Sequence, residues 1–208
     1  KSNLNHTNSE DLSALMMAAL HPSRLEIMRI LLRAGGAEVD RKNRSGLAAI
    51  SFASQGNAAA VEVLFREGHA DVNSADNQGF TPLMYACTNP ANIDCVRLLL
   101  EFFAEINRPA TATTPTGQKR DFINAADVEG KTALIVAANQ IGAIEIIRLL
   151  ISCHADVRAH TNEGETALHV AIKCKARRDI VAALIDAGAD RDSVIPPLNK
   201  SPLRIAVE

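Results

Sequence analysis

Apolar residues recur along the chain in a fixed seven-residue pattern. It occurs six times: SALMMAA from Ser13, AAISFAS from Ala48, TPLMYAC from Thr81, TALIVAA from Thr132, TALHVAI from Thr166 and SPLRIAV from Ser201. The starts lie 35, 33, 51, 34 and 35 residues apart, so every interval except the third is close to 34 residues. Self-similarity at such a period is typical of a stacked array of supersecondary units.

A second apolar segment follows each of the first five copies. In the segment IEIIRLLI, Ile144, Ile147, Leu150 and Ile151 recur at the spacing that places them on one face of a helix. Each unit is therefore predicted to contain two short helices and a turn. Because neither helix can bury its apolar face alone, we expect the units to stack on one another, with the terminal units least stable.

The 51-residue interval contains the stretch RPATATTPTGQKRDFINA, residues 108–125. One apparent repeat ending, EINRP at Glu105–Pro109, is followed by a second, FINAADVEG at Phe122–Gly130, which puts Asn107 and Asn124 at equivalent positions. The repeat pattern then resumes in phase. This favours an elongated finger at 108–125 over a linker between two domains.

Three of the six phenylalanines flank this finger, namely Phe102, Phe103 and Phe122. Their rings could pin the two stems of the finger against the repeat core. Alternatively, Phe102 and Phe103 fill the ordinary core between helices. The pattern leaves both interpretations open.

Composition narrows the class of protein. The 208 residues are 47% hydrophobic with a formal net charge of −2, so the chain can bury a substantial core. The near-balance of charge argues against a general nucleic-acid binder, and no apolar run is long enough to insert into a membrane. The chain starts without Met and lacks a closing polar segment, which leads us to expect a fragment of a longer protein.

The sequence offers no candidate for catalysis or cofactor binding. It has no Gly-rich phosphate loop, no H-E-x-x-H motif and no nucleophile elbow. The four cysteines form no CxxC pair, and the aspartates of LIDAGADRD at Leu184–Asp192 do not have the spacing of a calcium loop. We therefore expect a non-enzymatic protein with no cofactor, no metal and reduced intracellular cysteines.

Several motifs resemble the ankyrin repeat family, whose units of about 33 residues carry a T-P-L-H-x-A signature. The closest matches are GFTPLMYA at Gly79–Ala86, GKTALIVA at Gly130–Ala137, GETALHVA at Gly164–Ala171, GHADVN at Gly68–Asn73 and AGAD at Ala187–Asp190. The resemblance implies an all-α solenoid of stacked helix-turn-helix units with β-turn fingers. It implies one ankyrin repeat domain over 1–208, with repeats beginning near residues 11, 46, 79, 130, 164 and 199, the last one truncated.

The chain also departs from the family pattern. The signature His is present only as His169, and the other copies carry Met16, Ser51, Met84, Ile135 and Arg204 at this position. Where the family has Gly at the end of the second helix, this chain has Phe103 and His154. Repeat two lacks the Thr-Pro and is expected to be locally less stable.

Ankyrin arrays present a concave face made of finger tips and first helices, so the resemblance implies protein binding there. The exposed positions carried over from the family pattern are Asn77, Gln78, Phe80, Thr88, Asn89, Val128, Glu129, Lys131, Asn139, Gln140, Asn162, Glu163, Glu165, Lys173 and Cys174. Phe80 is the strongest single candidate for an interface anchor, unless its ring folds back onto a neighbouring finger. Tyr85 aligns with core positions.

Four cations lie close together in IKCKARRD, namely Lys173, Lys175, Arg177 and Arg178. They could dock an acidic segment or a phosphate, or form only a solvated turn. Two positions resemble modification sites: Thr114 precedes a proline, as in proline-directed phosphorylation, and Asn107 lies in a pattern resembling asparagine hydroxylation of ankyrin domains.

The sequence as a whole indicates a monomeric, non-catalytic protein-recognition module that binds a protein or peptide, without nucleic acid or membrane insertion. We expect it in a larger cytoplasmic scaffold, adaptor or regulatory protein, with the nucleus as a second location. The alternative is a targeting or autoinhibitory domain of a larger enzyme, ion channel or secreted bacterial effector.

Overall fold

The computed structural model describes residues 4–106, 122–174 and 178–191. The chain divides into two compact units. Unit 1 contains the described residues of Lys1–Ala86 and Asp94–Lys119, and unit 2 contains those of Cys87–Ile93 and Arg120–Glu208. The sixth repeat, which was predicted to begin near residue 199, lies outside the described residues.

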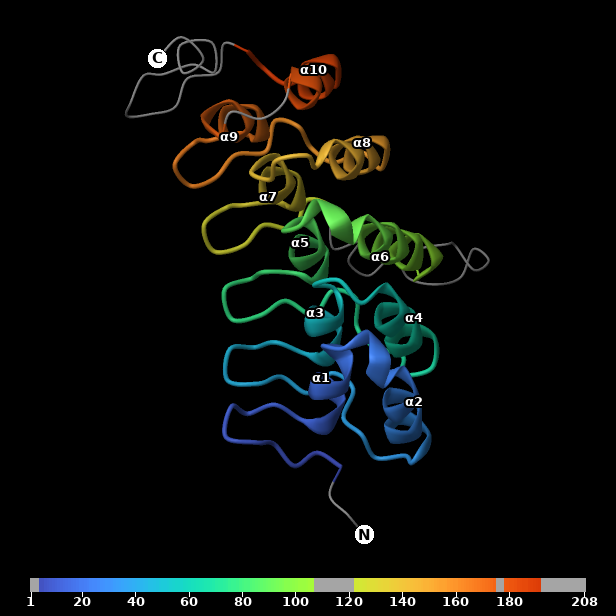
Figure 1. Ribbon diagram of the computed structural model, residues 1–208. Coiled ribbons are helices and arrows are strands. Elements are labelled where there is room, and N and C mark those ends of the chain that lie inside the picture. The colour runs from blue at the N-terminus through green and yellow to red at the C-terminus, as the bar shows by residue number, and fades with distance from the viewer. Residues whose placement is uncertain (1–3, 107–121, 175–177, 192–208) are drawn as a thin grey trace, which may run out of the picture. The chain divides into compact units, whose positions relative to one another are not determined.

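Unit 1 consists of helix pairs that stack in two layers (Figure 1). The first helices of its repeats are α1 (Ala14–Ala19), α3 (Ala49–Ala53) and α5 (Pro82–Cys87), and the second helices are α2 (Leu25–Arg33), α4 (Ala58–Arg66) and α6 (Ile93–Ile106). Only the last residue of α5 and the first residue of α6 are assigned to unit 2. A short 3-10 turn, η1 (Pro22–Arg24), precedes α2. Helix α1 packs on α2 and α3, and α4 packs on α2 and α3.

Unit 2 repeats the same arrangement. Its elements are the 3-10 turn η2 (Pro90–Asn92) and the helices α7 (Ala133–Ala138), α8 (Ile144–Ser152), α9 (Ala167–Lys173) and α10 (Arg178–Asp186). Helices α7 and α9 pack on each other, and α8 and α10 pack behind them. The described residues contain no strand beyond two isolated bridges, Thr7–Ser13 and His160–Thr166. The predicted all-α fold of stacked helix pairs is confirmed.

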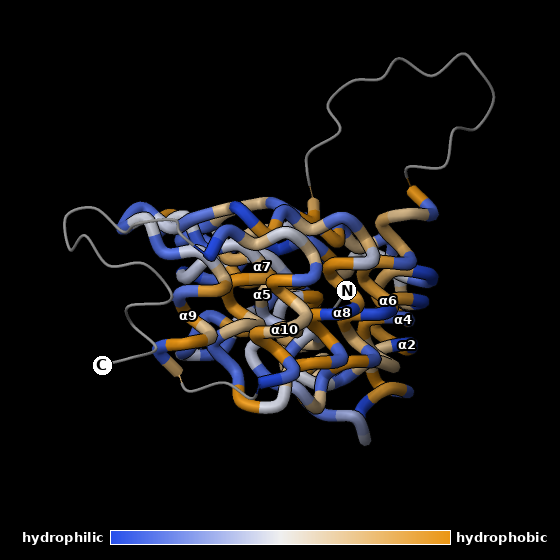
Figure 2. Tube along the Cα trace, turned by 90° about the horizontal axis from the view of Figure 1, so that it is seen from above, coloured by the Kyte–Doolittle hydropathy of each residue, from blue (hydrophilic) through white to orange (hydrophobic). Residues whose placement is uncertain are grey.

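The second helices bury one face each, whereas all six residues of the first helix α7 are buried. Hydrophobic and hydrophilic residues alternate along the second helices in Figure 2, as expected for helices that pack on one side. In α8 the buried side chains are Ile146, Ile147 and Leu150. Ile144 and Ile151, which the spacing also assigned to the buried face, are only half-buried.

Several first helices begin with a capping box, in which the N-cap residue and the residue three positions later hydrogen-bond to each other's backbone N–H groups. In repeat five, the Nδ1 atom of His169 accepts a hydrogen bond from the Thr166 backbone N–H at 3.3 Å. In repeat three, the sulfur of Met84 accepts from the Thr81 N–H at 3.4 Å, and Met16 does the same for Ser13 in repeat one. The methionines that replace the signature His therefore take over its hydrogen bond.

Repeat two lacks this arrangement. Ala48 stands at the start of α3 without a side-chain cap, although its backbone is as extended as that of Thr132 at the start of α7. The hydroxyl of Ser51 is buried without a hydrogen-bond partner. Lower local stability in repeat two therefore stays a prediction with a physical cause.

Helix α6 is longer than the repeat pattern predicted. Helices α4 and α8 are followed by His69 and His154, which adopt the left-handed conformation with φ of 55° and 66°. Phe103, at the equivalent position, remains helical, and α6 continues to Ile106. A left-handed backbone is costly for a bulky residue. The prediction that Glu105 and Ile106 belong to an ordinary repeat ending is therefore wrong.

The second apparent repeat ending, at Phe122–Gly130, makes the same contact as the repeat ending of repeat one. The side-chain oxygen of Asn124 accepts from the Asp156 N–H at 2.8 Å, as Asp40 does for Asp71 at 2.9 Å. Asn107, for which an equivalent place was expected, lies outside the described residues.

The phenylalanines beside the long interval are buried to different degrees. Phe102 is fully buried and stacks on Phe65 of α4, with ring centres 4.1 Å apart. Phe122 is buried within unit 2, and Phe103 is half-buried. The stack favours an ordinary core role for Phe102.

Candidate partner-binding surface

Each finger is shaped by a polar side chain at its base. Asp76 Oδ1 accepts hydrogen bonds from the backbone N–H groups of Gln78 and Phe80, at 2.9 and 2.8 Å. Asp127 accepts from Glu129 and Lys131 in the same way, at 2.9 and 2.7 Å. Such turns satisfy the backbone locally. The fingers therefore have a defined conformation before any partner binds.

Asparagines join neighbouring fingers within each unit. In unit 1 the Asn77 N–H donates to the Ser45 carbonyl at 3.0 Å, and its side-chain amide donates to the Arg44 carbonyl at 2.8 Å. In unit 2 Asn162 makes the same two bonds to Glu129 and Val128, at 2.8 and 2.9 Å. These amides were expected to face a partner, but the structure uses them to hold the fingers together.

The close approach of the fingers requires glycine. Gly46 has φ of +83°, and a Cβ atom there would lie 2.5 Å from the Asn77 nitrogen. Gly130 has φ of +80°, and its Cβ would lie 2.9 Å from the Asn162 nitrogen. Only glycine fits this backbone conformation and contact without displacement of the next finger.

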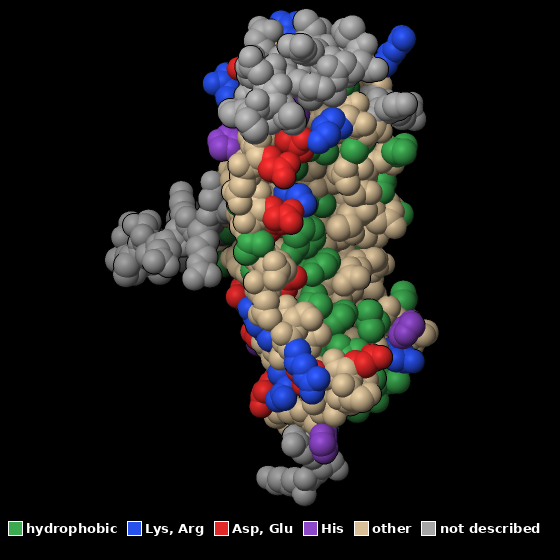
Figure 3. Space-filling view, turned by 90° about the vertical axis from the view of Figure 1, so that its left-hand side faces the viewer, with side chains coloured by type: hydrophobic (Ala, Val, Ile, Leu, Met, Phe, Trp, Pro, Cys, Tyr) green, Lys and Arg blue, Asp and Glu red, His purple; other side chains and the backbone are tan. Residues whose placement is uncertain are grey.

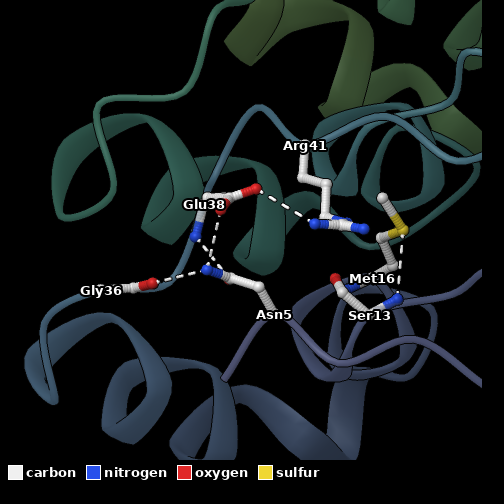
Figure 4. A network of polar contacts seen from close by, with 6 residues as sticks. All are labelled: Asn5, Ser13, Met16, Gly36, Glu38 and Arg41. Carbon is white, nitrogen blue, oxygen red and sulfur yellow. Dashed lines mark hydrogen bonds and ion pairs between the residues drawn. The ribbon is translucent and has the colours of Figure 1, made fainter. Parts of the chain in front are cut away.

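A polar network ties the amino-terminal segment to the end of repeat one (Figure 4). Asn5 donates to the Gly36 carbonyl at 2.9 Å and to the Glu38 carboxylate at 3.1 Å, and it accepts from the Glu38 N–H at 2.8 Å. Arg41 pairs with the other oxygen of Glu38 at 3.2 Å. The network therefore holds the segment Gly36–Arg41, which leads into the finger of repeat two.

Phe80 is half-buried on the surface of its own repeat. Its ring meets Tyr85 of α5 edge-on, with centres 4.8 Å apart. The Tyr85 hydroxyl donates to Asp76 Oδ2 at 2.6 Å. Burial and this hydrogen bond raise the pKa of Tyr85 above its usual range. Phe80 thus folds back onto its own first helix, and Tyr85 is half-buried where the alignment predicted a core residue.

Charges on the fingers of unit 2 are paired within the chain. Lys131 pairs with Glu129, and Lys173 of α9 pairs with Glu165. The hydrogen bonds to these carboxylates raise the pKa of both lysines. The finger side shows acidic and basic side chains next to one another (Figure 3). Glu163 is exposed beside these pairs.

The other predicted positions lie at the ends of first helices. Thr88 and Asn89 are exposed, and Asn89 accepts from the Ala91 N–H at 3.0 Å to begin η2. Asn139 is exposed and accepts from the Cys174 thiol at 2.8 Å, while Gln140 is half-buried. Val128 is 57% exposed at its finger.

The predicted cation cluster is described only in part. Lys173 is engaged with Glu165, and Arg178 is exposed as the first residue of α10. Lys175 and Arg177 lie outside the described residues, as do Thr114 and Asn107. Docking of an acidic segment or a phosphate by these cations stays a prediction, as do both modifications.

One basic finger was not among the predicted positions. Arg41, Lys42 and Arg44 surround the turn of repeat two, and Arg44 is exposed. Lys42 crosses to the next finger and donates to the Ala75 carbonyl at 2.6 Å. The run DRKNRS was the signal that could have identified this basic finger.

The described residues show no cluster of His, Cys, Asp and Glu that could hold a metal. No described helix has both the length and the apolar character that a membrane crossing requires. The four cysteines are free thiols, of which Cys87 and Cys95 are buried.

The chain is similar to known proteins throughout most of its length. It is 31% identical over 162 residues to human Ankyrin repeat and SOCS box protein 16, covering 74% of this chain and 32% of that protein. Human Ankyrin repeat and SOCS box protein 6 is 35% identical over 112 residues, or 51% of this chain and 22% of that protein. The Putative ankyrin repeat protein FPV031 of Fowlpox virus is 31% identical over 151 residues, or 72% of this chain and 40% of that protein.

The chain thus spans two fifths or less of the length of these relatives. A family model described as ankyrin repeats in three copies matches residues 15–110 and 116–194, which leaves a gap within the long interval. Together with the stacked helix pairs and fingers, this match covers most of the sequence. The chain belongs to the ankyrin repeat family.

Proposed function

We propose that this chain is a non-catalytic recognition module that binds a partner protein through its fingers and first helices. Ankyrin repeats generally mediate protein–protein interaction and are typically non-catalytic. The observation that carries the proposal is the internal bracing of the fingers, because Asn77 and Asn162 fix the backbone while Gln78, Glu129 and Glu163 stay exposed. A braced surface loses little conformational entropy on binding.

The elongated finger at 108–125 is part of the proposed surface. The repeat contacts resume with Asn124, near the end of this stretch, so residues 109–121 are additional to the repeats. Removing residues 109–121 should leave the helix pairs folded, because shortening a loop changes its closure entropy only slightly. Partner binding should weaken if the finger takes part.

The experiment is affinity capture from native lysate with the wild-type chain and charge-reversed finger variants. In unit 2, Glu129→Lys with Glu163→Lys should lose the partner. The control is Arg148→Glu, an exposed residue of the second helix α8, which should retain it. The proposal would be overturned if the Arg148→Glu control lost the partner and the finger variant retained it.

We place the module in a larger scaffold, adaptor or regulatory protein of the cytoplasm or nucleus. Free and buried thiols at Cys87 and Cys95 support a reducing compartment. Fractionation of native cells with an antibody to the chain tests this location, and recovery from a secreted fraction would contradict it.

A further inference from the structure

A hollow lies in unit 1 where the carboxyl-terminal ends of α4 and α6 meet, on helices that carry none of the predicted finger positions. It is lined by Phe65, Arg66, His69, Ala70, Asp71, Glu105 and Ile106. Glu105 and Ile106 belong to the part of α6 that continues beyond Phe103, where α4 and α8 have already ended. The hollow therefore exists because of the departure of α6 from the repeat pattern.

One wall of the hollow is apolar. Phe65 is held in place by its stack on Phe102, with an angle of 12° between the rings. Ile106 is 56% exposed although it is a large hydrophobic residue. An exposed isoleucine beside a fixed aromatic ring offers contact area to an apolar side chain of a partner.

The polar wall is acidic. Arg66 is already engaged by Glu62 at 3.5 Å and by Glu105 at 3.6 Å, and its guanidinium lies 5.0 Å from the centre of the Phe102 ring. Asp71 lines the hollow and has no ion pair with another described residue. Asp40 adds a second carboxylate, because its Oδ1 atom accepts from the Asp71 backbone N–H at 2.9 Å. Among the described residues, Arg66 is thus outnumbered by carboxylates.

We propose that this hollow is a second docking site, which binds a partner segment that presents a basic side chain next to an apolar one. The apolar side chain packs on Phe65 and Ile106. The cation lies at the carboxylates of Asp71 and Glu105, where charge complementarity selects it over an anion. This site is additional to the finger surface, and its occupation does not depend on the function proposed above.

The test uses three blocked peptides, Gly-Arg-Leu-Gly, Gly-Arg-Ser-Gly and Gly-Glu-Leu-Gly, titrated into the isotope-labelled chain to about 10 mM, the range of weak peptide contacts. Amide chemical shifts of Ala70, Asp71 and Glu105 report on the hollow. The Arg-Leu peptide should shift these amides with saturation. The Arg-Ser and Glu-Leu peptides should bind at least about fivefold more weakly.

A variant with Asp71→Asn and Glu105→Gln preserves the shape of the hollow but removes its carboxylate charges. It should weaken binding of the Arg-Leu peptide by about fivefold or more. Glu101→Gln is the matched control, because Glu101 is exposed on α6 and does not line the hollow. Thermal unfolding of each variant verifies that the chain still folds.

Several results would overturn the proposal. They are no saturable shift with the Arg-Leu peptide, equal binding of the Glu-Leu peptide, shifts confined to the fingers, or equal weakening by the control. Concentration-dependent shifts at these amides without peptide would mean that a second copy of the chain occupies the hollow, which also contradicts it.

Discussion

Replacing Met84 with leucine should cost more stability than a simple change of core packing. The Met84 sulfur accepts the hydrogen bond of the Thr81 N–H at 3.4 Å, and Thr81 is only 5% exposed. Leucine matches methionine in volume, so repacking alone costs less than about 1.5 kcal/mol. An orphaned buried donor adds about 1–3 kcal/mol, and the low end applies because sulfur is a weak acceptor.

The control is Met28→Leu in α2, because Met28 is equally buried but is not among the described sulfur acceptors. Urea unfolding should show Met84→Leu to be the less stable variant by about 1 kcal/mol, or about 2–4 °C in Tm. Hydrogen exchange of the Thr81 amide should accelerate in this variant. Met84→His, which introduces the acceptor found at His169, should restore the protection.

Equal loss of stability in Met84→Leu and Met28→Leu, with unchanged exchange of the Thr81 amide, would refute this reasoning. It would mean that the sulfur contributes only packing. The substitution of the signature His by methionine would then be tolerated for its volume rather than for its hydrogen bond.

Three further predictions concern stability. Gly46→Ala should destabilise unit 1 by about 3 kcal/mol in urea unfolding, because the new Cβ would meet Asn77. The control Gly142→Ala, at a residue with φ of +88° but open space around it, should cost only about 1 kcal/mol. Equal losses of stability in the two variants would contradict the importance of the finger contact. Ala48→Thr should raise stability by about 1 kcal/mol in the same assay, since it supplies the missing cap of α3, and a loss would show that the buried site has no room. Burial raises the pKa of the Cys95 thiol to about 11, whereas an unfolded thiol ionises near its ordinary pKa of about 8.5. The free energy of unfolding should therefore fall as pH rises from about 9 to 11. If Cys95→Ala showed the same slope of unfolding free energy against pH as the wild type, this reasoning would be contradicted.

Much of the fold could be predicted from the sequence because the determinants are local and repeated. Thr81, Thr132 and Thr166 mark helix starts, and the apolar spacing marks the buried faces. Six copies of one pattern also fix which segments become neighbours, since each unit can bury its core only against the next.

The remaining features depend on energies that a pattern does not contain. Whether α6 ends at Phe103 depends on the cost of a left-handed phenylalanine against the gain from further helical turns. Whether Asn77 faces a partner or the Arg44 carbonyl depends on the distance between stacked fingers. The pattern marks such residues as exposed, but only coordinates show what they contact.

The central claim, that partners bind the fingers, can be tested without knowing the partner. A photo-crosslinking amino acid is placed singly at Gln78 and Glu163 on fingers and at Arg97 and Arg148 on second helices, all four of which are exposed. In native lysate, the account predicts that one partner crosslinks to the finger positions and to neither second helix. Crosslinks that form only from Arg97 or Arg148 would contradict it.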